Sequence, residues 1–192
     1  MSIRKKILAI SIGPVLVLGV ITLLFMLTMV KSSLMDEVQD ALKGTAAATL
    51  AAYDQNTGDY LESTNGDIWK GSYNISKSES LVDRIKENTG MDVTFFYGNK
   101  RIMTSALDKK GNRILGSEAG ERVVNQVIKG KKPFFSTNVS LDGTRNYGYF
   151  IPVYQNGTTD QVIGMVFVGT NKARKDAIVN KILSLIHISE PT

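Results

Sequence analysis

Residues 91–99 have the sequence MDVTFFYGN and set the class of the fold. The first seven residues are rich in β-branched and aromatic side chains, which favour a strand, and Gly98-Asn99 is typical of a tight turn. The chain then returns through Arg101–Leu107, which again has the composition of a strand. These residues therefore predict two neighbouring antiparallel strands.

One helix and three more strands are predicted downstream. Glu118–Lys129 has a helical apolar period, and Gly130 and Pro133 end it. The inner face of this helix is predicted to carry Val123, Val124, Val127 and Ile128. The strands are Phe134–Leu141, Thr144–Tyr154 and Gln161–Gly169, and Asp142-Gly143 forms a hairpin turn between the first two. The sequence thus predicts an α+β fold, with one largely antiparallel five-stranded sheet and helices on one side and at its ends.

Near the N-terminus, three cations (Arg4, Lys5 and Lys6) precede Ile7–Val30, a segment without charged residues. At about 1.5 Å rise per residue, this segment spans roughly 36 Å, more than the roughly 30 Å hydrocarbon core of a bilayer. We predict a transmembrane helix over residues 7–30 and a cytoplasmic tail over residues 1–6, because flanking cations stay in the cytoplasm. A cleaved signal peptide is the alternative, but its apolar region is usually about 7–15 residues and ends in a clear cleavage site.

The helical pattern continues through Lys31–Tyr53, so a long extracytoplasmic helix is predicted over residues 31–56, continuous with the transmembrane helix. Small and apolar residues recur along it at spacings of two to four: Leu34, Val38, Ala41, Leu42, Thr45, Ala48, Leu50 and Ala52. Such a stripe favours a homodimer through this helix, and the alternative is that the stripe packs only on its own domain.

The main extracytoplasmic domain is predicted over residues 57–170. It begins with an ordered connection over Tyr60–Ser76, followed by a short helix that Gly90 ends. Ser76-Lys77-Ser78-Glu79 resembles a capping box at the start of that helix. After the last strand, residues 171–185 are predicted to form a helix that leads to a second, missing membrane span. We interpret residues 186–192 as a truncated or artefactual tail, which includes His187.

Composition excludes several classes of function. The formal net charge is +5, but three of the cations flank the apolar segment, so no basic stripe predicts nucleic-acid binding. The chain has no cysteine and one histidine, so we expect no cysteine or histidine metal site and no histidine-dependent catalytic triad in the domain. We therefore predict no enzyme activity, no cofactor and no metal.

The arrangement resembles the extracytoplasmic single-Cache (PAS-like) sensor domains of bacterial methyl-accepting chemotaxis proteins, and it is similar to citrate- and dicarboxylate-type sensor kinases. The resemblance covers about Leu81 to Thr170 and rests on four segments: Met91–Gly98, Arg101–Ser105, Val139–Pro152, and the Gly-x-x-x-x-Gly strand within Val162–Gly169. Members of that family continue into a second span, a HAMP relay and a cytoplasmic signalling coiled coil.

The resemblance implies a ligand pocket on one sheet face. In the citrate-type sensors, the position matching Arg101 binds a ligand carboxylate, and a guanidinium suits that role because it donates two parallel hydrogen bonds. Thr104 stands where those sensors carry a histidine. Strand alternation predicts that Arg101, Met103 and Ser105 share a face, opposite Ile102 and Thr104.

An aromatic wall is also predicted from the alternation along the strands. The full set of candidate ligand-binding residues is Arg101, Thr104, Ser105, Phe95, Tyr97, Phe135, Tyr147 and Tyr149. For these aromatic residues a place in the hydrophobic core is the alternative, and Lys132 is expected to be solvated.

We thus expect the extracytoplasmic small-molecule sensing domain of a membrane-integrated chemoreceptor. Its ligand is expected to be an organic acid or an amino acid. One alternative is the ectodomain of a sensor histidine kinase or cyclase. Another is a membrane-anchored interaction module that senses no solute.

Overall fold

The computed structural model describes the backbone of residues 3–188 and the side chains of residues 12–181 and 184. The chain divides into two compact units. One holds the described residues up to Val38 and those from Ile178 onward, and the other holds Gln39–Ala177. The predicted tail over residues 186–192 lies largely outside the described residues, as does the start of the predicted cytoplasmic tail.

Helix α1 (Ile3–Asp54) is one continuous helix, as the sequence predicts. It is the one helix among the described residues that is long and apolar enough to cross a membrane. Most of the large apolar side chains between Ile12 and Met29 are exposed by 44% to 69%, and Leu23 and Leu27 are partly buried. Thr22 and Thr28 donate their hydroxyl hydrogens to backbone carbonyls one turn earlier, so these polar groups are satisfied within the helix.

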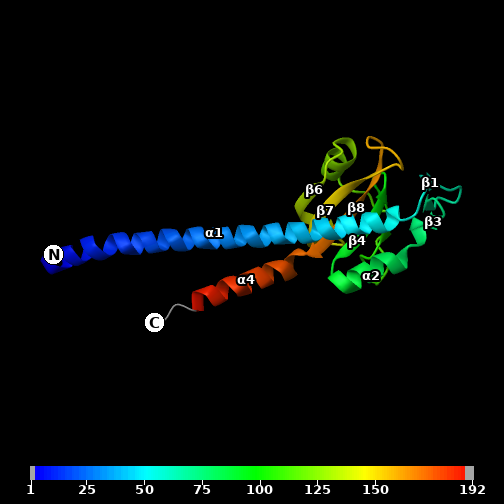
Figure 1. Ribbon diagram of the computed structural model, residues 1–192. Coiled ribbons are helices and arrows are strands. Elements are labelled where there is room, and N and C mark those ends of the chain that lie inside the picture. Colours follow the sequence, from blue (N-terminus) through cyan, green and yellow to red (C-terminus); the bar gives the residue numbers. More distant parts are fainter. Residues whose placement is uncertain (1–2, 189–192) are drawn as a thin grey trace. The chain divides into compact units, whose positions relative to one another are not determined.

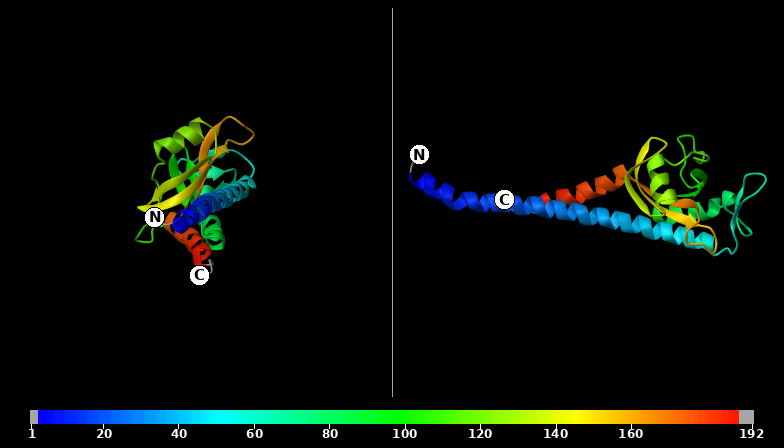
Figure 2. Two further views of the ribbon diagram at one scale, coloured as in Figure 1. Left: turned by 90° about the vertical axis from the view of Figure 1, so that its left-hand side faces the viewer. Right: turned by 90° about the horizontal axis from the view of Figure 1, so that it is seen from above.

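The second unit is built on a five-stranded antiparallel sheet with the order β5-β4-β8-β7-β6 (Figure 1). Its strands are β4 (Asp92–Tyr97), β5 (Lys100–Thr104), β6 (Phe134–Leu141), β7 (Thr144–Tyr154) and β8 (Val162–Asn171). β7 and β8, coloured yellow and orange, run side by side in Figure 2. The predicted number of strands, their positions along the chain and their antiparallel pairing are confirmed, and α4 (Lys172–Ile188) follows β8 directly.

A small three-stranded sheet replaces the predicted connection after α1. It consists of β1 (Tyr60–Glu62), β2 (Ile68–Lys70) and β3 (Tyr73–Asn74), and a short 3-10 turn, η1 (Ile75–Lys77), follows it. These strands have two or three residues each, too few for a period-two pattern to stand out.

Helix α2 (Glu79–Thr89) is confirmed, with Gly90 in the left-handed conformation at its end (φ 69°). The predicted capping box is wrong, because the Ser76 hydroxyl accepts from the Ile68 amide (2.9 Å), and the residue at the N-cap is Ser78, which makes no side-chain cap. Its hydroxyl instead donates to the carbonyl of Ile75 (2.7 Å) and lies 2.9 Å from the Tyr53 hydroxyl of α1.

One sheet face is covered by the last turns of α1. Leu42, Ala46, Thr49 and Tyr53 recur at helical spacing and are fully buried. The Tyr53 ring meets Phe95 of β4 edge-on, with 5.1 Å between ring centroids, and Thr45 contacts the Met91 sulfur at 3.4 Å. These buried residues differ from the predicted stripe, of which Leu42 is buried while Ala41 and Ala48 are exposed, and dimerisation through the helix stays a prediction.

The predicted helix after β5 begins later than expected, at Glu121. It consists of one α-helical turn, α3 (Glu121–Val123), and a π-helical stretch, η2 (Val124–Lys129). Glu118 pairs with Lys100, and the Ala119 amide donates to the Asn99 carbonyl (2.8 Å), so these residues extend along β5 instead of starting the helix. Val127 is fully buried, as its predicted inner position requires.

Candidate functional site

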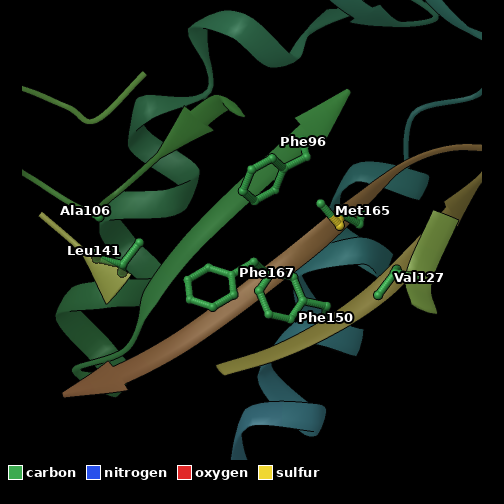
Figure 3. Packing of buried hydrophobic residues seen from close by; sticks show 7 residues of the cluster. All are labelled: Phe96, Ala106, Val127, Leu141, Phe150, Met165 and Phe167. Atoms are coloured by element: carbon green, nitrogen blue, oxygen red, sulfur yellow. The ribbon is translucent and has the colours of Figure 1, made fainter. Parts of the chain in front are cut away.

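A cavity of about 530 Å³ lies on the sheet face opposite Tyr53. Its floor is formed by Phe96 of β4, Phe150 of β7 and Phe167 of β8, which Figure 3 shows together on these adjacent strands. Residues 134–140 of the edge strand β6 form one wall, and residues 118–123 form the opposite side. The apolar floor and polar rim suit a small molecule with one apolar and one charged end.

The segment 114–119 is held along the outer edge of β5 by backbone hydrogen bonds. The Arg101 amide donates to the Ser117 carbonyl (2.9 Å), and the Arg101 carbonyl accepts from the Gly116 amide (2.9 Å). Just before this segment, both terminal nitrogens of Arg113 donate to the Asp83 carboxylate of α2, at 2.8 and 2.5 Å. These hydrogen bonds lower the pKa of Asp83 below its ordinary value. The cavity side that carries Glu118 is therefore anchored to both β5 and α2.

Arg101 is the buried charge of the cavity wall. Its side chain is only 8% exposed, lies over the Phe96 ring (5.3 Å to the centroid), and donates one hydrogen bond to the Ile114 carbonyl (3.3 Å). Its Nε is buried and has no hydrogen-bond partner among the described residues. Burial lowers the pKa of Arg101, but the ordinary value of an arginine is so high that the guanidinium stays charged at neutral pH.

A β-bulge places Arg101 on this face. Phe96 pairs with Arg101 and Phe95 pairs with Met103, so Ile102 is an extra residue in β5. Arg101 and Met103 therefore lie on opposite faces, and the predicted shared face is wrong. The bulge instead brings Thr104, which pairs with Thr94, onto the same face as Arg101.

Thr104 and Ser105 lie outside the cavity wall and serve the β4–β5 pairing. The Thr104 hydroxyl donates to the Val93 carbonyl (3.1 Å) and lies 2.7 Å from the Thr94 hydroxyl. The Ser105 hydroxyl accepts from the Val93 amide (2.9 Å) and donates to Asp92 (3.2 Å). Both side chains are buried and already satisfied.

The predicted aromatic residues share a sheet face, but it is the face that α1 covers. The strand register places Phe95, Tyr147 and Tyr149 on that face, and Phe95 packs between Tyr53 and Tyr60. Tyr97 is half-buried at the end of β4 and lies outside the cavity wall. Phe135 stacks on Tyr147 (6.4 Å between centroids) and also borders the cavity from the edge strand.

Of the eight predicted residues, the structure thus places Arg101 and Phe135 at the cavity. The residues that the prediction missed are the floor aromatics Phe96, Phe150 and Phe167, and the charged side chains Glu118 and Arg122. The alternation along each strand already separated the floor aromatics from their neighbours, but it could not tell which face is open. No pattern in the sequence marks Glu118 or Arg122.

Two side-chain contacts connect the sheet to α4, one from the β6 cavity wall and one from β7 on the face that α1 covers. The Lys172 ammonium donates to the Thr137 carbonyl of β6 (3.2 Å). The Tyr147 hydroxyl donates to the Asp176 carboxylate (2.6 Å), and burial together with this hydrogen bond raises the pKa of Tyr147 to about 12. The strand that borders the cavity and the helix that follows the sheet are thus in direct contact.

The charges at the cavity fit an anion or a zwitterion. Arg101 and Arg122 provide two guanidinium groups, and Glu118 provides one carboxylate. Arg122 lies over the Phe134 ring at 5.3 Å. Among the described side chains, no cluster of three metal-ligating residues is present. The arrangement is suited to reversible binding of a small molecule.

Comparison with known proteins identifies the family. The family described as Single cache domain 3 matches residues 73–182, more than half of the chain, and no curated protein matches. Similar solved structures include an extracellular ligand binding receptor from Desulfohalobium retbaense, with 15% identity and a TM-score of 0.54 over 80% of this chain and 26% of that chain.

Two further structures are similar at this level. One is the sensor domain of the V. cholerae histidine kinase DctB, with 13% identity and a TM-score of 0.55 over 85% of this chain and 59% of that chain. The other is the ligand-binding domain of the Campylobacter jejuni chemoreceptor Tlp3 in complex with L-valine, with 11% identity and a TM-score of 0.51 over 82% and 60%. The chain spans less than two thirds of the length of these structures, and the likeness shows a shared fold. The chain belongs to the single Cache domain 3 family.

Proposed function

We propose that this chain is the extracytoplasmic sensing part of a transmembrane chemoreceptor, and that it binds a small carboxylate in the cavity beside Arg101. The observation that carries the proposal is the buried guanidinium of Arg101, whose Nε has no partner among the described residues. A buried cation is costly to leave without a hydrogen-bonding anion, so the site favours a ligand that supplies one.

The membrane placement rests on α1. Its exposed apolar side chains between Ile12 and Met29 need an apolar environment, and the cations Arg4–Lys6 precede them. We therefore assign residues 7–30 to the membrane, residues 1–6 to the cytoplasm and residues 31–185 to the outside. A reporter fused after Thr170 is expected to report an extracytoplasmic location, and a cytoplasmic signal would overturn this assignment.

An amino acid or an organic acid is the ligand class that fits the charges. The Tlp3 structures are described with L-valine and with isoleucine bound, and both molecules carry a carboxylate and an apolar side chain. In this chain, Arg101 and Arg122 offer donors for a carboxylate, Glu118 offers an acceptor for an ammonium group, and the phenylalanine floor offers apolar contact.

Signalling requires that the ligand favour one of two packings of the domain. β6 borders the cavity, and Lys172 and Asp176 connect β6 and β7 to the start of α4. A shift of the β6 wall on ligand binding therefore reaches α4 through named contacts. The similarity to the DctB sensor domain supports a second candidate, in which the same domain controls a histidine kinase.

The test uses the full chain in lipid nanodiscs with L-valine, L-isoleucine, acetate and succinate as probes. At a concentration of 100 Kd, a ligand that binds only the folded state adds about 2.7 kcal/mol to the free energy of unfolding, which raises Tm measurably. We expect at least one probe to raise Tm, and we expect Arg101→Met to reduce this rise at the same probe concentration. The matched control is Arg84→Met, which removes an exposed arginine of α2. Absence of stabilisation by all four probes, or equal stabilisation of Arg101→Met, would count against the proposal.

A further inference from the structure

Two glycines face each other beneath the cavity floor. Gly148 of β7 and Gly169 of β8 are directly paired in the sheet register. Neither has a φ in the left-handed region, where a glycine is needed for backbone reasons. The requirement for glycine at these two positions must therefore come from the space above them.

That space is filled by the ring of Phe167. A Cβ at position 148 would lie 2.5 Å from Phe167 Cε2, and a Cβ at position 169 would lie 2.4 Å from Phe167 Cζ. Both distances are far below van der Waals contact. The ring therefore lies across the glycine pair, in the volume that two side chains would otherwise occupy.

Phe167 also forms part of the cavity floor. It is 1% exposed and borders the cavity, and its centroid lies 4.7 Å from that of Phe150. Figure 3 shows the two rings next to each other on β8 and β7. With the sheet below the ring and Phe150 beside it, the cavity is the open direction for any displacement of the ring.

We propose that Gly148 and Gly169 are specificity-determining residues. Because they lack side chains, the Phe167 ring can lie close to the sheet, and its position sets the depth of the ligand cavity. This inference rests on the proposed function. It adds to that function a size limit for the apolar part of the ligand. A side chain at either position lifts the ring into the cavity. At position 148 the added Cβ would also lie 2.8 Å from Cγ2 of Val139, another residue of the cavity wall.

Gly164 differs from this pair although it lies in the same Gly-x-x-x-x-Gly strand as Gly169. A Cβ at position 164 would lie 2.0 Å from the backbone carbonyl oxygen of Phe96. A backbone atom in a central strand cannot swing away as a ring can. Gly164 therefore permits the close approach of β4 and β8, whereas Gly169 serves the cavity.

The experiment measures the affinity of straight-chain monocarboxylates from acetate to octanoate by calorimetry, using the full chain in nanodiscs. For wild type, each added methylene should tighten binding by about fourfold until the cavity is filled. Gly148→Ala and Gly169→Ala should bind the shortest acids as wild type does, but their gain in affinity should stop at a shorter chain. Gly44→Ala, in an open position on α1, is the matched control and should follow wild type.

Substitution of Phe167 distinguishes a change in cavity depth from a general loss of folding or binding. Phe167→Leu should extend the series to longer acids, and Gly148→Ala combined with Phe167→Leu should recover the long acids that Gly148→Ala loses. Equal weakening of short and long acids in the glycine variants, or no effect of Phe167→Leu on the length limit, overturns the inference.

Xenon binding provides a second measurement of the cavity that does not depend on carboxylate recognition. The chemical-shift response of dissolved ¹²⁹Xe to the protein should fall in Gly148→Ala and Gly169→Ala, because the apolar cavity is shallower. If no carboxylate binds wild type, the proposed function fails while the xenon measurement still tests the cavity depth. An unchanged xenon response in both glycine variants overturns the inference in either case.

Discussion

The two faces of the five-stranded sheet carry similar aromatic side chains, and they differ in what covers them. On one face, Phe95 is enclosed between Tyr53 and Tyr60, and the hydroxyl groups of Tyr53 and Tyr147 are hydrogen-bonded. On the other face, Phe96 and Phe167 border a cavity together with the buried guanidinium of Arg101. The closed face follows the usual rule that buried polar groups are paired, and the open face departs from it at Arg101. Both faces bury aromatic rings, so both contribute to stability, and they differ in the open space and the incompletely paired charge of the cavity face, where we propose that the ligand binds.

The strongest test of this contrast removes one ring from each face. Phe95→Ala should lower the free energy of unfolding by about 3–5 kcal/mol, because the fully buried ring leaves a cavity between α1 and the sheet. Phe134→Ala, at a half-buried position on the cavity wall, should cost only about 1 kcal/mol. Chemical denaturation of both variants measures the difference, and equal losses would remove the contrast between the enclosed ring and the ring at the cavity wall.

Arg101→Met should separate stability from binding. It should weaken carboxylate binding by about 10- to 100-fold, the value of charge-assisted hydrogen bonds to a ligand. The same change should raise the free energy of unfolding by about 1 kcal/mol, because it removes a buried and incompletely paired charge. Calorimetry and denaturation on the same preparation check both effects. A variant that loses stability would show that Arg101 belongs to the scaffold.

Tyr147→Phe should act on the closed face alone. Loss of the hydrogen bond to Asp176 should lower the free energy of unfolding by about 1 kcal/mol and leave ligand affinity unchanged. The folded-state pKa of Tyr147, about 12, lies above the ordinary value of 10.0. Its contribution is therefore complete below pH 10 and is lost as the pH rises toward 12. Denaturation at pH 7 and at pH 11 tests this, and a difference from wild type that grows with pH would contradict it.

The smallest effect is expected for Asp83→Asn, which weakens the anchor of the segment beside the cavity. The pair with Arg113 is partly exposed, so its loss should cost about 0.5–1 kcal/mol at pH 7. Because the pKa of Asp83 is lowered in the folded state, the pair stabilises the protein above the ordinary carboxyl pKa of about 4. This difference from wild type should shrink as the pH falls below that value. A difference that persists at pH 2 would show that charge is not its cause.

Residue patterns predicted the parts of the fold that repeat along the chain. The period-two segments predicted all five strands of the main sheet, and the apolar run that continues into Lys31–Tyr53 predicted one long helix. These elements extend over many residues, so a single irregular position does not hide them. The three short strands between Tyr60 and Asn74 lack that redundancy and were missed.

The site was harder to predict because it depends on tertiary packing, which local residue patterns do not encode. Alternation grouped Phe95 with Tyr97 correctly, but whether α1 covers that face or the opposite one is decided by packing between distant segments. The bulge at Ile102 places Arg101 and Met103 on opposite faces of the sheet, and no residue pattern in the sequence marks this bulge. Arg101 was found through the family resemblance, while Glu118 and Arg122 reach the cavity from a connection that has no repeating pattern.

The segment 114–119 covers part of the outer edge of β5 and so limits strand pairing between copies of this domain. Both backbone hydrogen-bonding groups of Arg101 are occupied, by Ser117 and by Gly116. An exposed strand edge is a template on which a second polypeptide can add its own strand, and this border of the sheet is shielded at that position. In the proposed membrane setting, where many identical domains meet at high local concentration, such shielding protects the receptor from edge-to-edge aggregation.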